Sequence, residues 1–258
     1  MVGEVPYPYD PGAFPPFAVT ADVALFTIGN NALQALLIER GREPFLGARA
    51  LPGGFVREDE DLRDAAAREL AEETGLHAGP WYLEQLAAYG SPDRDPRMRV
   101  VTVAFWAVCA SLPASPRGGG DAAAANLLPV EDIERGAVRL AFDHARIVAD
   151  AVERIRSSME HTALAAGFCP PEFTIRQLRE VYETVWGVSL DPGNFQRYVR
   201  ESGVFEPSLA LSAPGRDDTR SEPGRPASLW TARRTESGRP AKAVRRLARP
   251  GGKQARNR

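Results

Sequence analysis

Short apolar runs rich in β-branched residues alternate with turns from about residue 18 to residue 110, a pattern typical of strands joined by loops. We predict strands over residues 19–26, 32–38, 81–89 and 100–108. Leu62–Thr74 departs from this pattern, because Ala and Leu fill it at helical spacing, Asp61 can cap its start and Gly75 can end it. Residues 111–125, with Pro, Ser, a Gly triplet and an Ala run, are predicted to form a flexible loop.

The second half of the chain is predicted to begin with one long helix over residues 141–162, placed to bridge two domains. Its apolar positions recur at helical spacing: Val148, Val152, Ile155 and Met159. The Cys169-Pro170-Pro171 run then interrupts the helical pattern.

Two short helices separated by a tight turn follow. Thr174 and Gln177 form a capping box for the first, which Gly187 can close, while Asp191 can cap the second and Pro192 suits its first turn. The positions expected to face inward are Leu178, Val181, Tyr182, Val185, Phe195 and Val199, and Gly203 is the expected stop. Apolar runs at 204–211 and 227–232 can then pair as a two-stranded wing, which makes this region a helix-turn-helix candidate.

Composition and charge narrow the class of protein. The 258 residues are 43% hydrophobic and 26% charged, the balance of a soluble globular protein with one large domain or two ordinary ones. Residues 1–17 lack the basic start and the apolar run of a secretion signal. No later stretch is apolar for long enough to cross a membrane. We therefore expect a cytoplasmic protein. Residues 216–258 carry 13 Lys/Arg against 4 Asp/Glu, so this basic end either meets a phosphate-bearing polymer or is a solvated tail.

The candidate chemistry lies in the sequence GFVREDEDLRDAAARELAEETGL, which begins at Gly54. With 100° of rotation per residue, Glu69, Glu72 and Glu73 fall within a sector of roughly 100° on one helix face. Carboxylates at this spacing repel one another unless a cation neutralises them, and oxygen ligands suit Mg²⁺ or Mn²⁺. Arg68 can form ion pairs with Glu60 or Glu69 and hold these metal ligands in place.

This segment resembles the Nudix box, G-x5-E-x7-R-E-U-x-E-E-x-G-U, at every defined position. The matching residues are Gly54, Glu60, Arg68, Glu69, Leu70, Glu72, Glu73, Gly75 and Leu76. The resemblance implies that the Gly54 carbonyl also reaches the metal, that Arg68, Glu69, Glu72 and Glu73 are catalytic, and that the substrate is a nucleoside diphosphate joined to another group. An exposed glutamate-rich helix is the structural alternative.

The loop at residues 91–97 is similar to one in Nudix proteins that handle ADP-ribose, where Arg94 and Arg97 would grip the pyrophosphate; a charged surface hairpin is the alternative. Relatives that hydrolyse ADP-ribose often place an acidic base in the loop corresponding to 111–125, whose only carboxylate here is Asp121. Glu69 or Glu72 would then have to serve as the general base, and slow turnover is expected.

A Nudix domain followed by a bridging helix and a winged helix resembles the Nudix-related transcriptional regulators of NAD metabolism, the NrtR family. The second signature is FTIRQLREVYETVWGVSLDPGNFQRYVRESGVFEP followed by GRPASLW. The resemblance implies an α+β protein: a Nudix α/β/α sandwich with a mixed sheet, then a winged helix-turn-helix. The expected organisation is an arm at 1–17, the Nudix domain at 18–139, the bridging helix at 140–168, the winged helix at 169–232 and a disordered basic tail at 233–258.

The residues expected to meet double-stranded DNA lie on the second helix, where Asn and Gln favour adenine and Arg favours guanine, and around the wing. They are Asn194, Gln196, Arg197 and Arg200, with Arg225, Arg233 and Arg234 near phosphate. Family members usually carry basic residues where this chain has Pro192-Gly193. Deleting residues 233–258 is therefore hypothesised to weaken binding to all DNA sequences and flatten its salt dependence.

Three functional interpretations remain open at this point. The first is a homodimeric, ADP-ribose-responsive repressor of NAD synthesis or salvage genes. The second is a Mg²⁺-dependent ADP-ribose pyrophosphatase whose back half is only structural. The third is a nucleic-acid-processing Nudix enzyme that holds RNA with its basic tail. His144, at the start of the bridging helix, has no metal partner at suitable spacing and is expected to be structural.

Overall fold

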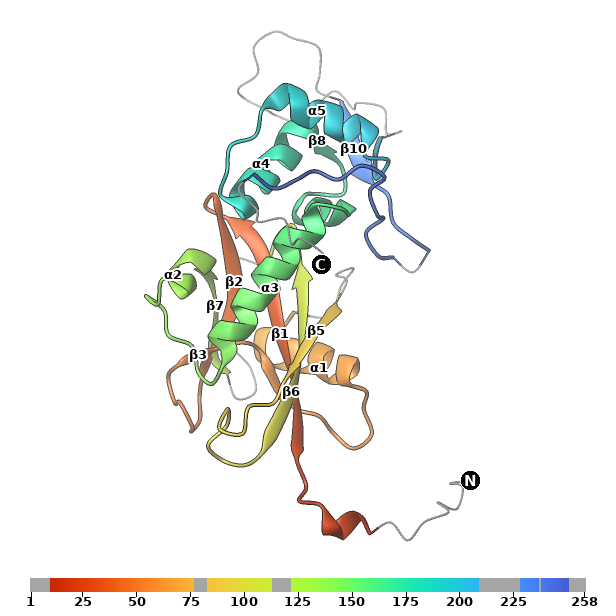
Figure 1. Cartoon of the computed structure of the whole chain (residues 1–258). Helices are drawn as coiled ribbons and strands as arrows, with labels where there is room; N and C mark the ends of the chain where they lie inside the picture. The colour runs from red at the N-terminus through yellow and green to blue at the C-terminus, as the bar shows by residue number, and fades with distance from the viewer. Residues whose placement is uncertain (1–9, 77–82, 113–121, 209–227, 237, 251–258) are drawn as a thin grey trace, which may run out of the picture.

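The structure is a computed structural model that describes residues 10–76, 83–112, 122–208, 228–236 and 238–250. A β-sheet unit occupies one end of the elongated molecule and a small helical unit the other, joined by one long helix (Figure 1). Within the described residues, no helix is both long and apolar enough to cross a membrane.

One mixed sheet organises the first unit. Its central strand β1 (Ala18–Gly29) pairs antiparallel with β2 (Ala32–Arg40) and parallel with β6 (Val100–Val108). The order is β3-β2-β1-β6-β5, with β4 paired to β1 and β7 paired to β2; these strands are β3 (Arg49–Ala50), β4 (Gly53–Phe55), β5 (Glu84–Tyr89) and β7 (Ala122–Pro129). Asn30 and Asn31 form the turn from β1 to β2 with φ of 51° and 57°, the left-handed conformation that two-residue hairpin turns demand.

Helices cover both faces of this sheet, because alternate residues of β1 point in opposite directions. Val23 and Leu25 pack in the same buried cluster as Leu70 of α1 (Leu62–Thr74). Ala24 and Phe26 face the other way and share a cluster with α3 (His144–Met159) and α2 (Val130–Glu134). The layers are therefore helix, mixed sheet and helix, as expected.

The second unit is a winged helix. It contains η2 (Ala163–Phe168), β8 (Phe173–Thr174), α4 (Ile175–Trp186), α5 (Pro192–Glu201), β9 (Phe205–Pro207) and β10 (Leu229–Ala232). The sequence signals act as predicted: Thr174 and Gln177 form the capping box, Gly187 ends α4 with φ of 66°, and Asp191 accepts from the Asn194 N–H at the start of α5. β10 pairs antiparallel with β9 and with β8.

Helix α3 is shared by both units, so their cores are continuous. The buried Tyr182 hydroxyl of α4 donates to the Met159 carbonyl at the end of α3 (3.0 Å). Trp186 Nε1 donates to the Arg156 carbonyl (3.1 Å), and Arg156 Nε donates to the Val185 carbonyl (3.1 Å). These hydrogen bonds fix α4 against the last turn of α3.

Two predictions about order are wrong. Residues 122–125 are not loop, because their backbone completes the β2 edge of the sheet: Ala125 pairs with Ile38 and Ala124 with Glu39. The described part of the basic tail, 233–236 and 238–250, is also ordered. The other residues of the expected loop and tail, 113–121, 237 and 251–258, lie outside the described residues.

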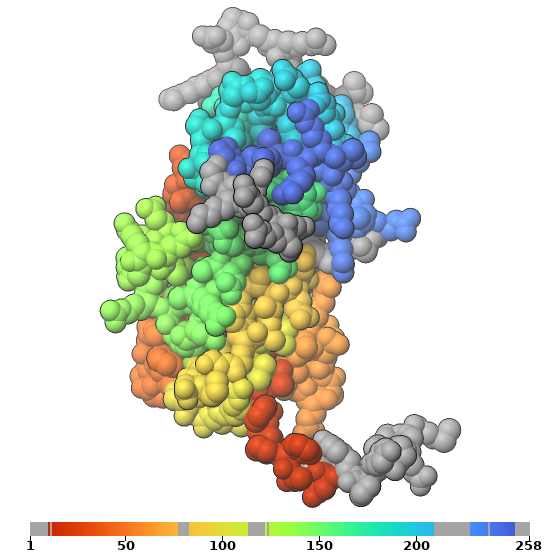
Figure 2. Space-filling model, in the orientation of Figure 1, coloured from red at the N-terminus to blue at the C-terminus, as the bar shows by residue number. Residues whose placement is uncertain are grey.

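Residues 241–250, which we call the C-terminal strap, lie across the junction between α3 and the winged helix (Figure 2). Backbone hydrogen bonds join Ala241 O to Ala163 N, Ala243 N to His161 O, Val244 N to Ser202 O and Leu247 N to Glu160 O. Arginines of the strap form ion pairs with α3 and α5: Arg245 with Glu201, Arg246 with Glu160 and Arg249 with Glu153. Basic composition alone predicted disorder, but acidic partners on two helices neutralise these arginines.

Candidate functional site

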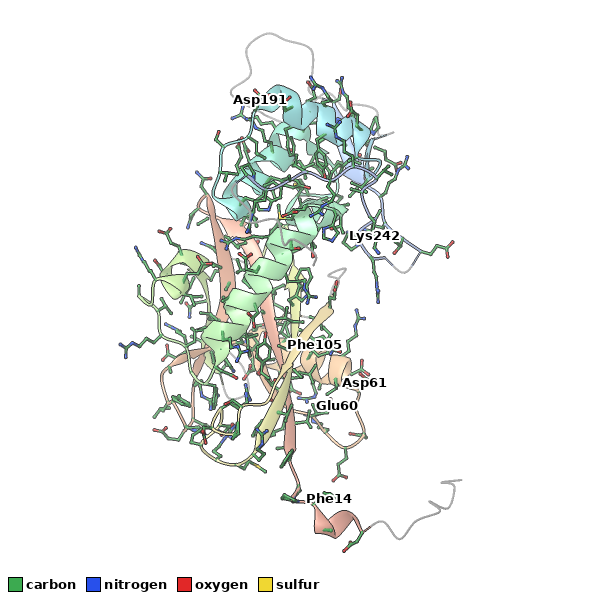
Figure 3. The ribbon with its side chains drawn as sticks, in the orientation of Figure 1. Phe14, Glu60, Asp61, Phe105, Asp191 and Lys242 are labelled. Carbon is green, nitrogen blue, oxygen red and sulfur yellow. The ribbon has the colours of Figure 1, made fainter. Side chains whose placement is uncertain are left out.

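Arg68 organises the acidic face of α1. Its guanidinium lies 2.5 Å from Glu60 Oε1, 2.7 Å from Glu69 Oε1 and 3.2 Å from Glu72 Oε2, and it also donates to the Phe55 carbonyl of β4. The hydrogen bond from Arg68 is the main cause that lowers the pKa of Glu60 to about 2. The expected pairing of Arg68 with Glu60 and Glu69 is thus present, and it positions the loop before α1, where Glu60 and Asp61 lie (Figure 3).

Glu73 and the two glycines of β4 form the inner edge of this site. The Gly53 N–H donates to Glu73 Oε2 (2.9 Å). Burial raises the pKa of Glu73 to about 8, with Glu69 adding to the effect, and burial also raises the pKa of Glu69. A Cβ on Gly54 would overlap the Glu69 carboxylate, so a larger residue here would displace Glu69 from its present position.

The carboxylate oxygens at this site are the type of ligand that a hard divalent cation prefers. The buried Glu73 and the half-buried Glu69, whose pKa values are both raised, stand where a cation would favour their ionised forms. Among the described residues, however, no three His, Cys, Asp or Glu side chains converge as a metal cluster. Glu69 and Glu72 are held by Arg68, so both would have to turn toward Glu73 to share an ion.

A cavity of about 110 Å³ opens beside Glu73. Its wall is formed by the sheet, by the loop of residues 91–97 and by the residues that begin α3. The polar and aromatic lining residues that matter below are Asp22, Arg94, Arg97, Phe142 and His144. The structure therefore brings both predicted loop arginines to the same cavity as the last glutamate of the Nudix box.

The two arginines differ in their surroundings. The Arg94 side chain is 3% exposed; it lies 2.8 Å from Asp143 Oδ1 and 3.7 Å from Asp22 Oδ2. The Arg97 side chain is 41% exposed and pairs at 2.7 Å with Asp95. Its guanidinium also lies 5.2 Å from the ring centroid of Phe55, within the range of a cation–π contact.

His144 is buried beneath this cavity and is structural, as expected. Its Nδ1 accepts from the Leu51 N–H (2.9 Å), so Nε2 is the nitrogen that carries the proton and faces Asp22 Oδ2 at 3.7 Å. Burial lowers the pKa of His144, which keeps the ring neutral. The sequence analysis missed Asp22 and Asp143; a lone carboxylate inside the apolar run of β1 was the one signal available for Asp22.

The second candidate site is the outer face of α5, at the opposite end of the molecule from α1 (Figure 3). Phe195 and Val199 are buried, whereas all four residues proposed from the sequence are exposed: Asn194, Gln196, Arg197 and Arg200. Arg233 and Arg234 are exposed beside β10, and Arg233 pairs with Glu206 (2.8 Å). Arg225 lies outside the described residues.

Comparison with known proteins agrees with this two-part organisation. The NUDIX domain matches residues 17–151, and the NrtR DNA-binding winged helix domain matches residues 165–232. The chain is 34% identical over 224 residues to the "ADPR responsive transcriptional repressor NtrR" of Acinetobacter baylyi, covering 86% of this chain and 84% of that relative.

Solved structures give the same result. NrtR of Shewanella oneidensis, complexed with a 27mer DNA, superimposes with a TM-score of 0.70 at 30% identity, over 89% of this chain and 99% of that one. The NUDIX domain of the same NrtR, complexed with ADP ribose, has a TM-score of 0.51 at 37% identity, over 57% of this chain and 94% of that one. With a Nudix sandwich and a winged helix built on one shared helix, this chain belongs to the NrtR family of Nudix-related transcriptional regulators.

Proposed function

We propose that this protein is an ADP-ribose-responsive DNA-binding repressor of genes for NAD synthesis or salvage, and that it acts as a homodimer. The observation that carries the proposal is the physical continuity of the two sites: an arginine-lined Nudix cavity and a winged helix with an exposed polar face share one core through α3. The ADP-ribose complex and the DNA complex of the Shewanella NrtR support the choice of ligand and polymer.

The Nudix cavity serves in this proposal as the effector site. Arg94 and Arg97 bind the pyrophosphate, because a planar guanidinium can donate two parallel hydrogen bonds to phosphate oxygens. Two aromatic rings that line the cavity, the exposed Phe55 and the half-buried Phe142, offer apolar faces to the rest of the ligand. The buried Arg94 marks the inner end of the site and the half-exposed Arg97 its outer rim.

The exposed face of α5 serves as the DNA-reading surface. An α-helix fits the major groove, and a two-fold dimer would place two such helices on successive turns of the duplex. Glu60 and Asp61 of the Nudix unit lie far from Asp191 at the start of α5 (Figure 3). Dimer formation is checked by sedimentation equilibrium with and without operator DNA.

Arg197→Ala is expected to weaken operator binding by about 1–3 kcal/mol, or about 5- to 150-fold, because an arginine that reads a guanine edge contributes that much. The measurement is fluorescence anisotropy with operator DNA and with a scrambled duplex. Arg139→Ala, which removes an exposed charge from the Nudix unit, is the matched control and should leave both affinities unchanged. An equal loss on both duplexes would instead place Arg197 on phosphate.

Deletion of residues 241–258, which include the C-terminal strap, is expected to weaken DNA binding because α5 loses its orientation, rather than because phosphate contacts are lost. The strap holds Ser202 at the end of α5 and Glu160 on α3, so its removal loosens the helix that reads DNA. We expect the free energy of unfolding to fall by about 1–2 kcal/mol net, and Tm by about 2–8 °C.

The triple variant Arg245→Gln, Arg246→Gln, Arg249→Gln separates the two explanations. Those arginines already pair with glutamates, so the variant should preserve the slope of log Kd against log salt and nearly all the stability. A slope reduced by about 0.9 for each lost charge would favour the sequence-based hypothesis of phosphate contacts for these three arginines.

A slow Mg²⁺- or Mn²⁺-dependent hydrolysis of ADP-ribose is the second candidate function, favoured by the intact glutamate cluster around Arg68. When bound, the metal would lower the pKa of water and neutralise phosphate charge. Gly54, Glu69, Glu72 and Glu73 would hold it, and Glu69 or Glu72 would accept the proton. AMP release should disappear in Glu72→Gln; rapid turnover by the native protein would contradict the expected slow rate.

The experiment that tests the proposed function measures anisotropy with DNA from upstream of NAD synthesis and salvage genes, at fixed salt, with and without ADP-ribose. Tight binding that ADP-ribose weakens supports the regulator. No specific binding under any condition would contradict it and leave the hydrolase as the function of the Nudix unit.

A further inference from the structure

The first turn of α3 is tied to the effector cavity by a buried charge network. Arg94 Nη2 lies 2.8 Å from Asp143 Oδ1, and Arg94 Nε lies 3.2 Å from Asp143 Oδ2, so the contact is two-pronged. Asp22, whose Oδ2 lies 3.7 Å from the same Arg94 Nη2, is the second carboxylate of the network. Asp143 is the residue immediately before α3, and its side chain makes no capping hydrogen bond to the helix. The charge of Asp143 is therefore directed at Arg94, a lining residue of the cavity, rather than at its own helix.

Phe142 gives a second, independent link between the cavity and α3. It is a lining residue of the cavity and has φ of 53°, the left-handed region that costs a non-glycine residue about 1–2 kcal/mol. Its ring packs edge-on against Phe45, at 4.9 Å between centroids, and beneath the Arg40 guanidinium at 4.8 Å. The chain thus enters α3 through a strained residue that the surrounding side chains hold in place.

The other end of α3 is anchored to the DNA-binding unit. Tyr182 and Trp186 of α4 donate to carbonyls of its last turns, and the strap pairs with Glu153 and Glu160. Sixteen helical residues span about 24 Å, and a packed helix moves as a rigid body at that length. A displacement of the first turn of α3 would therefore also displace α4 and α5.

We propose that the Arg94–Asp143 ion pair is the contact through which the effector controls DNA affinity, and that Asp143 is a positioning residue for the winged helix. A diphosphate in the cavity carries more negative charge than one carboxylate and draws the Arg94 guanidinium away from Asp143. The first turn of α3 is then released, and α3 carries the change to the winged helix, which lowers its affinity for DNA. This inference rests on the proposed function.

Arg97, the other arginine of the 91–97 loop, lacks such an ion pair. Its carboxylate partner is Asp95, two residues away in its own loop, and it reaches the entry to α3 through the Phe142 ring, whose centroid lies 5.9 Å from its guanidinium. Arg94 is the loop arginine whose partner precedes the bridging helix. The same comparison predicts that substitution of Arg94 reduces the coupling more than substitution of Arg97, whereas both substitutions weaken ligand binding.

Asp143→Asn tests the proposal, because it keeps the shape of the side chain and removes its charge. Without ligand, the variant should bind operator DNA as weakly as the native protein does with saturating ADP-ribose, a loss of about 5- to 150-fold. Added ADP-ribose should then change its DNA affinity less than about twofold, while ADP-ribose itself binds more tightly than to the native protein. Asp132→Asn, which breaks an ion pair on α2, is the control and should respond like the native protein.

The possible outcomes are distinct. If the native protein responds to ADP-ribose and Asp143→Asn responds equally, the coupling proposal is overturned while the proposed function stands. If the native protein binds no operator, or ADP-ribose leaves its DNA affinity unchanged, the proposed function fails and the coupling fails with it. Hydrogen exchange on the native protein gives a test independent of the variant: ADP-ribose should speed exchange of the amides at 144–148, and unchanged protection there would overturn the proposal.

Discussion

Phe195→Ala is expected to lower the free energy of unfolding by about 3–5 kcal/mol, the usual cost of removing a buried phenylalanine ring from a packed core. Phe195 is 1% exposed and lies between the rings of Tyr182 and Tyr198, at centroid distances of 5.2 Å and 5.9 Å. The corresponding fall in Tm is about 6–20 °C. Because this ring fixes α5 on α4, specific DNA binding should fall to the non-specific level, a loss of about a thousandfold or more.

ADP-ribose binding by Phe195→Ala should survive at temperatures where the protein stays folded, because the residues of the Nudix cavity lie on the sheet, α1 and the start of α3. Calorimetric titration with ADP-ribose and anisotropy with DNA separate the two effects. Phe14→Ala, at a phenylalanine that is 60% exposed, is the matched control and should shift Tm by little. Full operator binding by Phe195→Ala would show that α5 is not the DNA-reading element.

Gly53→Ala is expected to disrupt the Nudix site by displacing the backbone of β4. A Cβ on Gly53 would lie 2.5 Å from the Ala21 carbonyl and 2.8 Å from Asp22 Cα, and it would overlap the Asp22 carboxylate. Backbone atoms of β1 cannot turn aside as a flexible side chain can, so β4 must move away from β1. We expect a loss of about 3 kcal/mol and no measurable ADP-ribose binding, because the Gly53 N–H would also lose Glu73.

Gly90→Ala is the control for this change, since its Cβ would meet the Val101 side chain at 3.4 Å and Arg99 Nη2 at 3.9 Å, both ordinary contacts. Thermal unfolding and calorimetric titration with ADP-ribose check both variants. If Gly53→Ala binds ADP-ribose with native affinity, ADP-ribose binding does not depend on the position of β4. The effector would then have to bind elsewhere.

Features that depend on neighbouring residues could be predicted from the sequence. Asp61 and Gly75 bound α1, and Thr174 with Gln177 starts α4, because capping is decided within one turn of helix. The Nudix box is equally local: Arg68 and Glu72 meet because four residues separate them on one helix. The Nudix unit, the winged helix and the acidic face of α1 followed from such short-range signals.

Only the tertiary structure decided which distant charges meet. Arg94, Asp22 and Asp143 come from a loop, a central strand and the start of α3, and no periodicity relates them. Composition alone could not tell whether the arginines of the strap are solvated or form ion pairs. They are ordered because the surface that the strap crosses carries Glu153, Glu160 and Glu201. The sequence by itself determined the parts of this protein, since helices, caps and motifs depend on contacts a few residues apart. The coupling between the parts was decided by folding, because it depends on long-range contacts whose partners no local pattern specifies.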